Sequence, residues 1–224
     1  MDAFETDIIK TSAGDLEITF IGHGSLMFRF GGKIIHIDPY SQVADYRKFP
    51  KADLIVLAHD HPDHYDPAAF EAVRNKDTVV VYTETCAQRV VGGIVMKNGD
   101  VQTVMGIKIE AVPAYNIVHK RPDGPLFHPK GYGNGYVMTF GDERVYVAGD
   151  TENIPEMKAL SSIDYAFLPM NLPYTMTPEM TADAARMFRP KVLYPYHYGE
   201  TDPSLLVALL KDSPDIEVRV RKMM

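Results

Sequence analysis

The sequence has few of the features that would place the protein outside the cell or in a membrane. Its single cysteine, Cys86, excludes an intramolecular disulfide and is expected to be a small buried thiol. No run approaches the roughly 18 apolar residues of a membrane-spanning helix. The N-terminal segment has no basic stretch followed by an apolar one, so no signal peptide is predicted. We therefore expect a cytoplasmic protein.

An excess of positive charge is also missing. The formal net charge of −7 disfavours binding to nucleic acid or anionic lipid through bulk charge. Hydrophobic residues make up 46% of the chain and charged residues 24%, which is ordinary for a globular protein. We expect one α/β domain over residues 1–224 and a small-molecule substrate, with no nucleic acid and no membrane span. Homo-oligomer formation is left open.

Short apolar segments rich in β-branched and aromatic residues recur along the chain. Tight turns at 30–33 and 140–144 contain the glycines typical of hairpins, so the neighbouring strands are expected to pair. The predicted strands are 16–22, 25–30, 33–38, 52–58, 78–82, 107–112, 135–141, 144–150, 164–170, 191–196 and 216–220.

Helical segments alternate with the later strands. Segments 66–75, 177–188 and 202–211 each begin with Asp or Thr followed by Pro, as expected for an N-cap and the first helical position. Such a mixture of hairpins and β-α units predicts a layered α/β protein. Residues 116–134 contain three prolines and three glycines without any period, which indicates a site loop or a mobile surface excursion.

The segment LAHDHPDHYD, residues 57–66, concentrates three histidines and three aspartates. His59 follows an apolar strand, and His61 leaves an extended backbone on the same side. Asp63 and His64 lie on the turn before the next helix. Imidazole and carboxylate groups suit Zn²⁺, with Fe, Mn or Ni as alternatives. The pattern H-x-H-x-D-H therefore predicts a metal site with room for two ions.

Two later strands also end in a candidate ligand. Asp150 follows the apolar segment 144–149, and His197 follows 191–196. Ligands bind at the carboxyl ends of strands in open α/β sheets, so these side chains are expected to join the same site.

Taken together, H-x-H-x-D-H, the GDT of residues 149–151 and His197 resemble the metallo-β-lactamase fold superfamily. Residues 21–40, IGHGSLMFRFGGKIIHIDPY, resemble its compact group of ascorbate-phosphate lactonase-like hydrolases and phospholipase-D-type phosphodiesterases. The resemblance covers nearly the whole chain. It implies a four-layer αββα sandwich with a dinuclear site along one edge.

The resemblance also implies a ligand set. His59 and His61 would bind metal 1, and Asp150 would bridge the two metals. The remaining ligands, those of metal 2, would be Asp63, His64 and His197.

The third histidine usual for metal 1 is missing. Its expected position is occupied by Tyr115. We expect His128 to replace it, because an apolar residue and a proline flank it, and we hold His119 in reserve. If neither side chain reaches metal 1, the site would be mononuclear.

Several further residues are candidates for the site. Tyr115, Tyr174 and Lys130 are expected to contact substrate, Lys130 through an anionic group unless it is simply solvated. His23 is expected either to donate a hydrogen bond to substrate or to be a turn residue. Asp38 would orient a metal-binding histidine or cap a turn.

The expected activity is that of a metal-dependent hydrolase. A metal-bound hydroxide would attack a phosphodiester, ester or lactone of a small anionic substrate. Asp63 would orient the hydroxide and shuttle a proton. The alternative is a non-catalytic, metal-stabilised binding or sensing module, which the tyrosine at position 115 favours.

Overall fold

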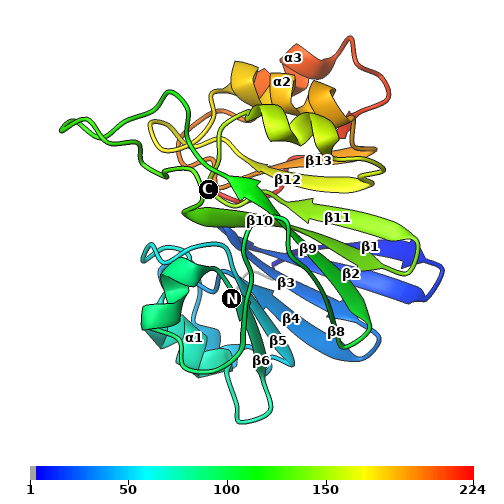
Figure 1. The fold of residues 1–224 in the computed structure, drawn as a ribbon. Coiled ribbons are helices and arrows are strands. Elements are labelled where there is room, and N and C mark those ends of the chain that lie inside the picture. Colours follow the sequence, from blue (N-terminus) through cyan, green and yellow to red (C-terminus); the bar gives the residue numbers. More distant parts are fainter. Residues whose placement is uncertain (1–3) are drawn as a thin grey trace.

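Two mixed β-sheets form the centre of the protein, whose computed structural model describes residues 4–224 (Figure 1). In the first sheet the strands lie side by side in sequence order, antiparallel up to β4 and parallel from there on. Its seven strands are β1 (Glu5–Thr11), β2 (Gly14–Gly22), β3 (Ser25–Phe30), β4 (Lys33–Ile37), β5 (Leu54–Leu57), β6 (Val79–Tyr82) and β7 (Ile94–Val95).

The second sheet repeats this arrangement. Its strands also follow one another in sequence order, antiparallel up to β11 and parallel beyond it. They are β8 (Val101–Val104), β9 (Ile107–Ala114), β10 (Gly133–Phe140), β11 (Glu143–Val147), β12 (Tyr165–Pro169), β13 (Val192–Tyr196) and β14 (Glu217–Val218).

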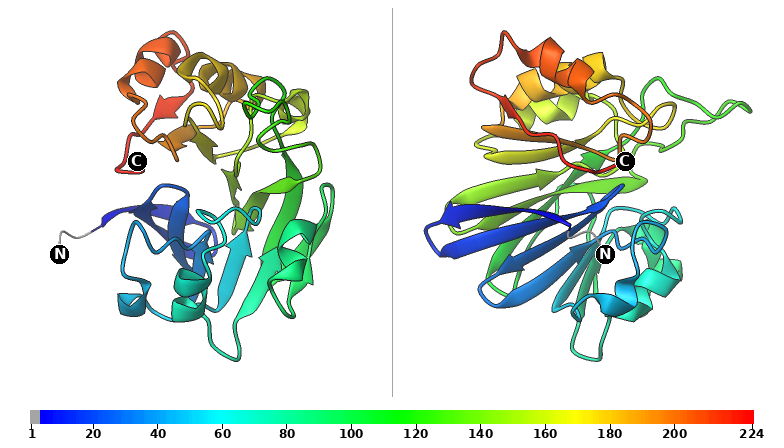
Figure 2. Two further views of the ribbon diagram at one scale, coloured as in Figure 1. Left: turned by 90° about the vertical axis from the view of Figure 1, so that its left-hand side faces the viewer. Right: turned by 180° about the vertical axis from the view of Figure 1, so that it is seen from behind.

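Helices cover the outer faces of both sheets, which gives the expected four layers (Figures 1 and 2). The α-helix α1 (Pro67–Val73) lies on the first sheet, whereas α2 (Pro178–Phe188) and α3 (Ser204–Leu210) lie on the second. No helix among residues 4–224 has the length and apolar character needed to cross a bilayer. Short 3-10 helices occur at η1 (Tyr46–Lys48), η2 (Glu84–Gln88) and η3 (Pro155–Ala159).

The two sheets share one apolar core. Phe20 and Phe28 of the first sheet contact Phe167 of the second, with ring centres 6.1 and 6.3 Å apart. A separate apolar cluster lies between α1 and the first sheet, and α1 contributes the buried residues Phe70 and Val73 to it. Full burial of such side chains contributes roughly 1.5–3 kcal/mol each, so the core fixes the sheets and with them the loops at their ends.

Most local signals of the sequence act as expected. Both hairpin turns form, with Phe30 paired to Lys33 and Phe140 to Glu143. The Asp66 side chain accepts from the backbone N–H groups of Ala68 and Ala69, so it caps α1.

One helical prediction needs correction. The third helix begins at Ser204 with Pro203 at its N-cap, one residue later than predicted. Asp202 still accepts a hydrogen bond from the Ser204 N–H, at 2.9 Å, although it lies outside the helix. The stretch around Cys86 forms the 3-10 helix η2, and the Cys86 thiol is buried as expected.

Candidate metal centre

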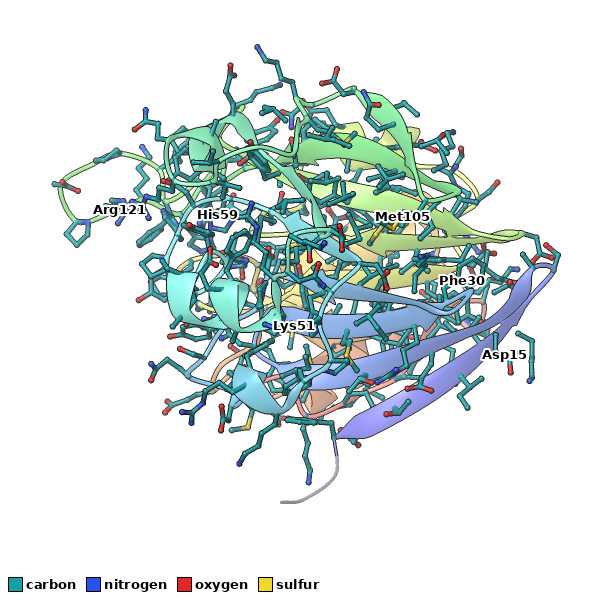
Figure 3. The ribbon with its side chains drawn as sticks, turned by 90° about the horizontal axis from the view of Figure 1, so that it is seen from below. Asp15, Phe30, Lys51, His59, Met105 and Arg121 are labelled. Atoms are coloured by element: carbon teal, nitrogen blue, oxygen red, sulfur yellow. The ribbon has the colours of Figure 1, made fainter. Side chains whose placement is uncertain are left out.

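The candidate ligands converge at one end of the two sheets. Figure 3 shows His59 at the end opposite the turns that carry Phe30 and Met105. The loops that follow β5, β11 and β13 reach this end, as does the turn between β2 and β3. The residues that they bring together are His23, His59, His61, Asp63, His64, Asp150 and His197, and the loop after β9 adds His128.

One group consists of His59, His61 and His128, whose nearest ring nitrogens all lie within 4.8 Å of one another. Nε2 of His128 lies 3.1 Å from Nδ1 of His61. His119, the reserve candidate, points elsewhere, since its Nδ1 lies 2.8 Å from Oε1 of Glu152. The loop after β9 therefore places an imidazole from position 128 where Tyr115 lacks one.

Two further groups of potential ligands lie beside the first. One combines His59, His64 and Asp150, and the other combines Asp63, His197 and His23. The Asp63–His197 group includes His23, which the sequence indicated only as a substrate contact or turn residue.

The Asp150 carboxylate lies between these groups. Its Oδ1 is 3.3 Å from Nε2 of His64 and 3.5 Å from Nε2 of His197. Its Oδ2 is 3.3 Å from Nε2 of His128. Each oxygen therefore faces a different half of the cluster.

Several buried polar atoms at this point have no hydrogen-bond partner within residues 4–224. Oδ1 of Asp150 and the Nε2 atoms of His59, His64 and His197 are all buried and unpaired. Leaving such groups unpaired costs free energy, and a cation coordinated at their centre would remove that cost. Imidazole nitrogens with carboxylate oxygens suit Zn²⁺, Mn²⁺, Fe²⁺ or Ni²⁺, so these residues fit a divalent metal.

The ionisation states of His59, His128 and Asp63 also suit a bound cation. Burial lowers the pKa of His128 to about 4 and that of His59 well below its usual value, so both imidazoles are neutral and can act as ligands. Burial opposes ionisation of Asp63, but the charge of His64, the nearby His197 and the hydrogen bond with His23 outweigh it and lower the pKa of Asp63.

Asp38 holds His64 in place. Its Oδ2 lies 2.8 Å from Nδ1 of His64, and its Oδ1 accepts a hydrogen bond from the Ala58 N–H at 2.8 Å. With its Nδ1 facing Asp38, the ring presents Nε2 to the centre. Of the two roles expected for Asp38, the orienting contact is therefore the one that the geometry provides.

Asn116 and Glu152 support His128, and sequence reasoning missed both. Oδ1 of Asn116 accepts from both the backbone N–H and Nδ1 of His128. Nδ2 of Asn116 donates to Oε1 of Glu152 at 3.0 Å, and Oε2 of Glu152 accepts from the N–H groups of Ile117 and Val118. The available signal was an acidic residue two positions after the strand-end Asp150.

The loop after β9 forms an ordered arm, residues 117–127, that projects from the body of the molecule (Figure 1). Lys120 and Leu126 pair across it as an isolated antiparallel bridge. The Arg121 N–H donates to the Pro125 carbonyl at 2.7 Å. Segment 116–134 also contributes Arg121, Phe127 and His128 to the cavity over the candidate ligands, as expected for a site loop.

A cavity of about 440 Å³ opens over the candidate ligands. His23 and Tyr174 line it, as expected for substrate contacts, and so do several residues that the sequence did not single out. These additional residues are Tyr40, Pro62, Arg121, Phe127 and Asn171.

Two expected substrate contacts lie outside this cavity. The Tyr115 hydroxyl donates to Oε2 of Glu156 at 2.9 Å, and Nζ of Lys130 donates to Oε1 of the same carboxylate at 2.6 Å. Neither Tyr115 nor Lys130 lines the cavity. Their polar groups face Glu156, so their contact with substrate stays a prediction that this cavity does not support.

Known proteins share both this sequence and this fold. A model of the beta-lactamase superfamily domain matches residues 17–197. A UPF0173 metal-dependent hydrolase of Pelotomaculum thermopropionicum is 30% identical, over 92% of this chain and 96% of the relative.

Solved structures agree. A protein of Parabacteroides distasonis, provisionally named a metal-dependent hydrolase, is 52% identical with a TM-score of 0.94, over 99% of this chain and all of that one. Igni18, a metallo hydrolase of Ignicoccus hospitalis, is 25% identical with a TM-score of 0.75, over 92% of this chain and 95% of that one. The chain therefore belongs to the metallo-β-lactamase superfamily and, within it, to the metal-dependent hydrolases.

Proposed function

We propose that this hydrolase uses two divalent cations, with zinc expected and Mn, Fe or Ni as alternatives. Its substrate would be a small anionic molecule with a phosphodiester, ester or lactone bond. The main observation behind this proposal is the position of Asp150, whose two carboxylate oxygens face different halves of the buried cluster. Within residues 4–224, several potential ligand atoms of that cluster have no hydrogen-bond partner.

The proposed ligands divide between two sites. Metal 1 would be held by His59, His61 and His128, whose ring nitrogens lie together. Asp150 would contact both ions. Metal 2 would be held by Asp63, His64 and His197.

Bound cations would lower the pKa of a water molecule and polarise the bond to be cleaved. The chain supplies the positioning of the reacting groups. Asp63 lines the cavity, and its lowered pKa keeps the carboxylate ionised, so that it can accept a hydrogen bond from a water molecule and orient it. Nε2 of His23 lies 3.0 Å from Oδ2 of Asp63, so His23 can hold that carboxylate in place and face the substrate.

The non-catalytic alternative loses its main support. It was favoured by the tyrosine at position 115, which leaves metal 1 short of a histidine. His128 lies beside His61 instead and can fill that position.

Metal analysis combined with a panel of ester, lactone and phosphodiester substrates tests the proposal. Purified protein is expected to bind about two equivalents of metal and to hydrolyse at least one substrate class. His64→Ala should lower that activity by at least 100-fold, because it removes a ligand of metal 2. Activity that survives this substitution unchanged would contradict the mechanism, and stoichiometric metal without any hydrolysis would favour the binding module.

A further inference from the structure

Arg121 is an exposed cation that lines the cavity. It lies on the arm, at the same end of the molecule as His59 (Figure 3). Its guanidinium carbon is 5.2 Å from the centre of the Phe127 ring, and both residues line the cavity. Within residues 4–224, no carboxylate oxygen lies within 4 Å of its nitrogens.

The arm holds Arg121 in a defined position. The Gly124 N–H donates to the Arg121 carbonyl at 2.9 Å, which closes the turn at the tip of the arm. Phe127, beneath the guanidinium, packs edge-on against Tyr174 with ring centres 5.0 Å apart. Since a fixed guanidinium loses less freedom when it binds a ligand, this stacking prepares Arg121 for an anion.

Among the described residues that line the cavity, no second lysine or arginine is present. Arg121 is the one Lys or Arg among these residues. Lys130, which the sequence favoured for the same task, lies outside the cavity and is neutralised by Glu156.

We propose that Arg121 binds an anionic group of the substrate that is separate from the bond to be cleaved. This inference rests on the proposed function. A carboxylate or a phosphate would suit the planar fork of donors that arginine presents. The neighbouring rings of Phe127 and Tyr174 would contact an apolar or planar part of the same molecule. The substrate class is thus a small ester, lactone or phosphodiester that carries a second carboxylate or phosphate.

The test compares two esters with the same leaving group. Mono-4-nitrophenyl glutarate carries a free carboxylate, whereas 4-nitrophenyl valerate is its neutral analogue. In metal-loaded protein, Arg121→Ala is expected to raise KM for the glutarate ester about tenfold, with little change in kcat. The valerate ester should be hydrolysed as by the wild type, and Arg121→Lys should recover part of the loss.

Lys120→Ala is the matched control, because it removes the same charge from the same arm at an exposed position outside the cavity lining. It should leave both esters unaffected. Equal kinetics of Arg121→Ala and Lys120→Ala on the glutarate ester would overturn the assignment of Arg121.

A binding measurement separates this inference from the proposed function. If the wild type hydrolyses neither ester, calorimetric titration of the metal-loaded protein with glutarate and with methyl phosphate still tests Arg121. About tenfold weaker binding in Arg121→Ala than in Lys120→Ala would support the anion site, and the ligand affected would identify it as a carboxylate or phosphate site. Equal affinities would refute it, whatever the reaction.

Discussion

Asn116 fixes the orientation of His128 with a single atom. Its Oδ1 lies 2.7 Å from Nδ1 of the His128 ring and 2.8 Å from the His128 backbone nitrogen. Because an amide oxygen can only accept, Nδ1 must carry the proton, and the lone pair of Nε2 is left for the metal centre. Both residues are buried, so water does not compete for these two hydrogen bonds.

Replacing Asn116 with alanine should therefore weaken metal binding. Loss of a hydrogen-bond partner behind a metal-binding histidine typically costs 10–100-fold in affinity, so a decrease of about that size is expected. Competition with a chromogenic chelator measures it directly. Asn153→Ala is the control, because the half-buried Asn153 amide donates to Asp183 rather than to a candidate metal ligand. Equal metal affinity of the two variants would show that Asn116 does not position His128.

Glu152 should be needed for the base of the arm. Its buried carboxylate accepts from the backbone N–H groups of Ile117 and Val118, each at 2.7 Å. In Glu152→Gln the amide would place N–H donors against other donors, and we expect a loss of roughly 1–3 kcal/mol in the free energy of unfolding. Urea denaturation measures that loss, and hydrogen exchange should speed up at residues 117–119.

Glu156→Gln is the matched control for Glu152. The Glu156 carboxylate pairs with the exposed Lys130 at the surface, so its replacement should change stability by less than about 1 kcal/mol. If Glu152→Gln and Glu156→Gln unfold alike and exchange alike at the arm, Glu152 has no special role there.

The sequence predicts the buried central strands of the two sheets better than the exposed strands. Eleven segments with β-rich apolar runs correspond to strands, because buried central strands carry a strong local pattern. Strands β1, β7 and β8 were missed, because β1 and β8 are largely exposed and lack such a run, and β7 is only two residues long. β1 is held by distant contacts, such as that of Asp7 with Arg221, which no local pattern encodes.

The same limit applies to the candidate site. His59, His61 and His64 form a dense local motif, and their convergence follows from one turn. Asn116 and Glu152 are 36 residues apart and meet only when β9 and the loop after β11 lie side by side. Arg121 was passed over for Lys130 because sequence alone does not reveal which cation has a carboxylate partner.

Removal of metal should destabilise the folded protein. The unpaired Nε2 atoms of His59, His64 and His197 face a common centre, and a cation bound there stabilises only the folded state. At a free metal concentration 1,000 times the Kd, linkage predicts about 4 kcal/mol per site. Tm should therefore fall when EDTA is added and recover when zinc is restored. A Tm that is the same with and without EDTA in protein shown to bind zinc would contradict this prediction.

His36 should make stability depend on pH away from the metal centre. Its ring is fully buried, and its Nε2 donates to the Pro50 carbonyl at 3.2 Å. Burial is the main cause that lowers the pKa of His36 to about 4. The unfolded chain therefore takes up a proton near pH 6.5 that the folded chain refuses until about pH 4, so stability falls as the pH decreases through this range.

His36→Gln isolates that contribution. Glutamine keeps a nitrogen donor for the Pro50 carbonyl but has no proton to gain in this range. Between pH 6.5 and 4, the wild type should lose at most about 3 kcal/mol more than the variant in urea denaturation, because the proton linkage of His36 is absent from the variant. The histidines of the metal centre titrate in both proteins and cancel in the difference. Parallel pH profiles for the two proteins would mean that His36 is not held neutral by burial.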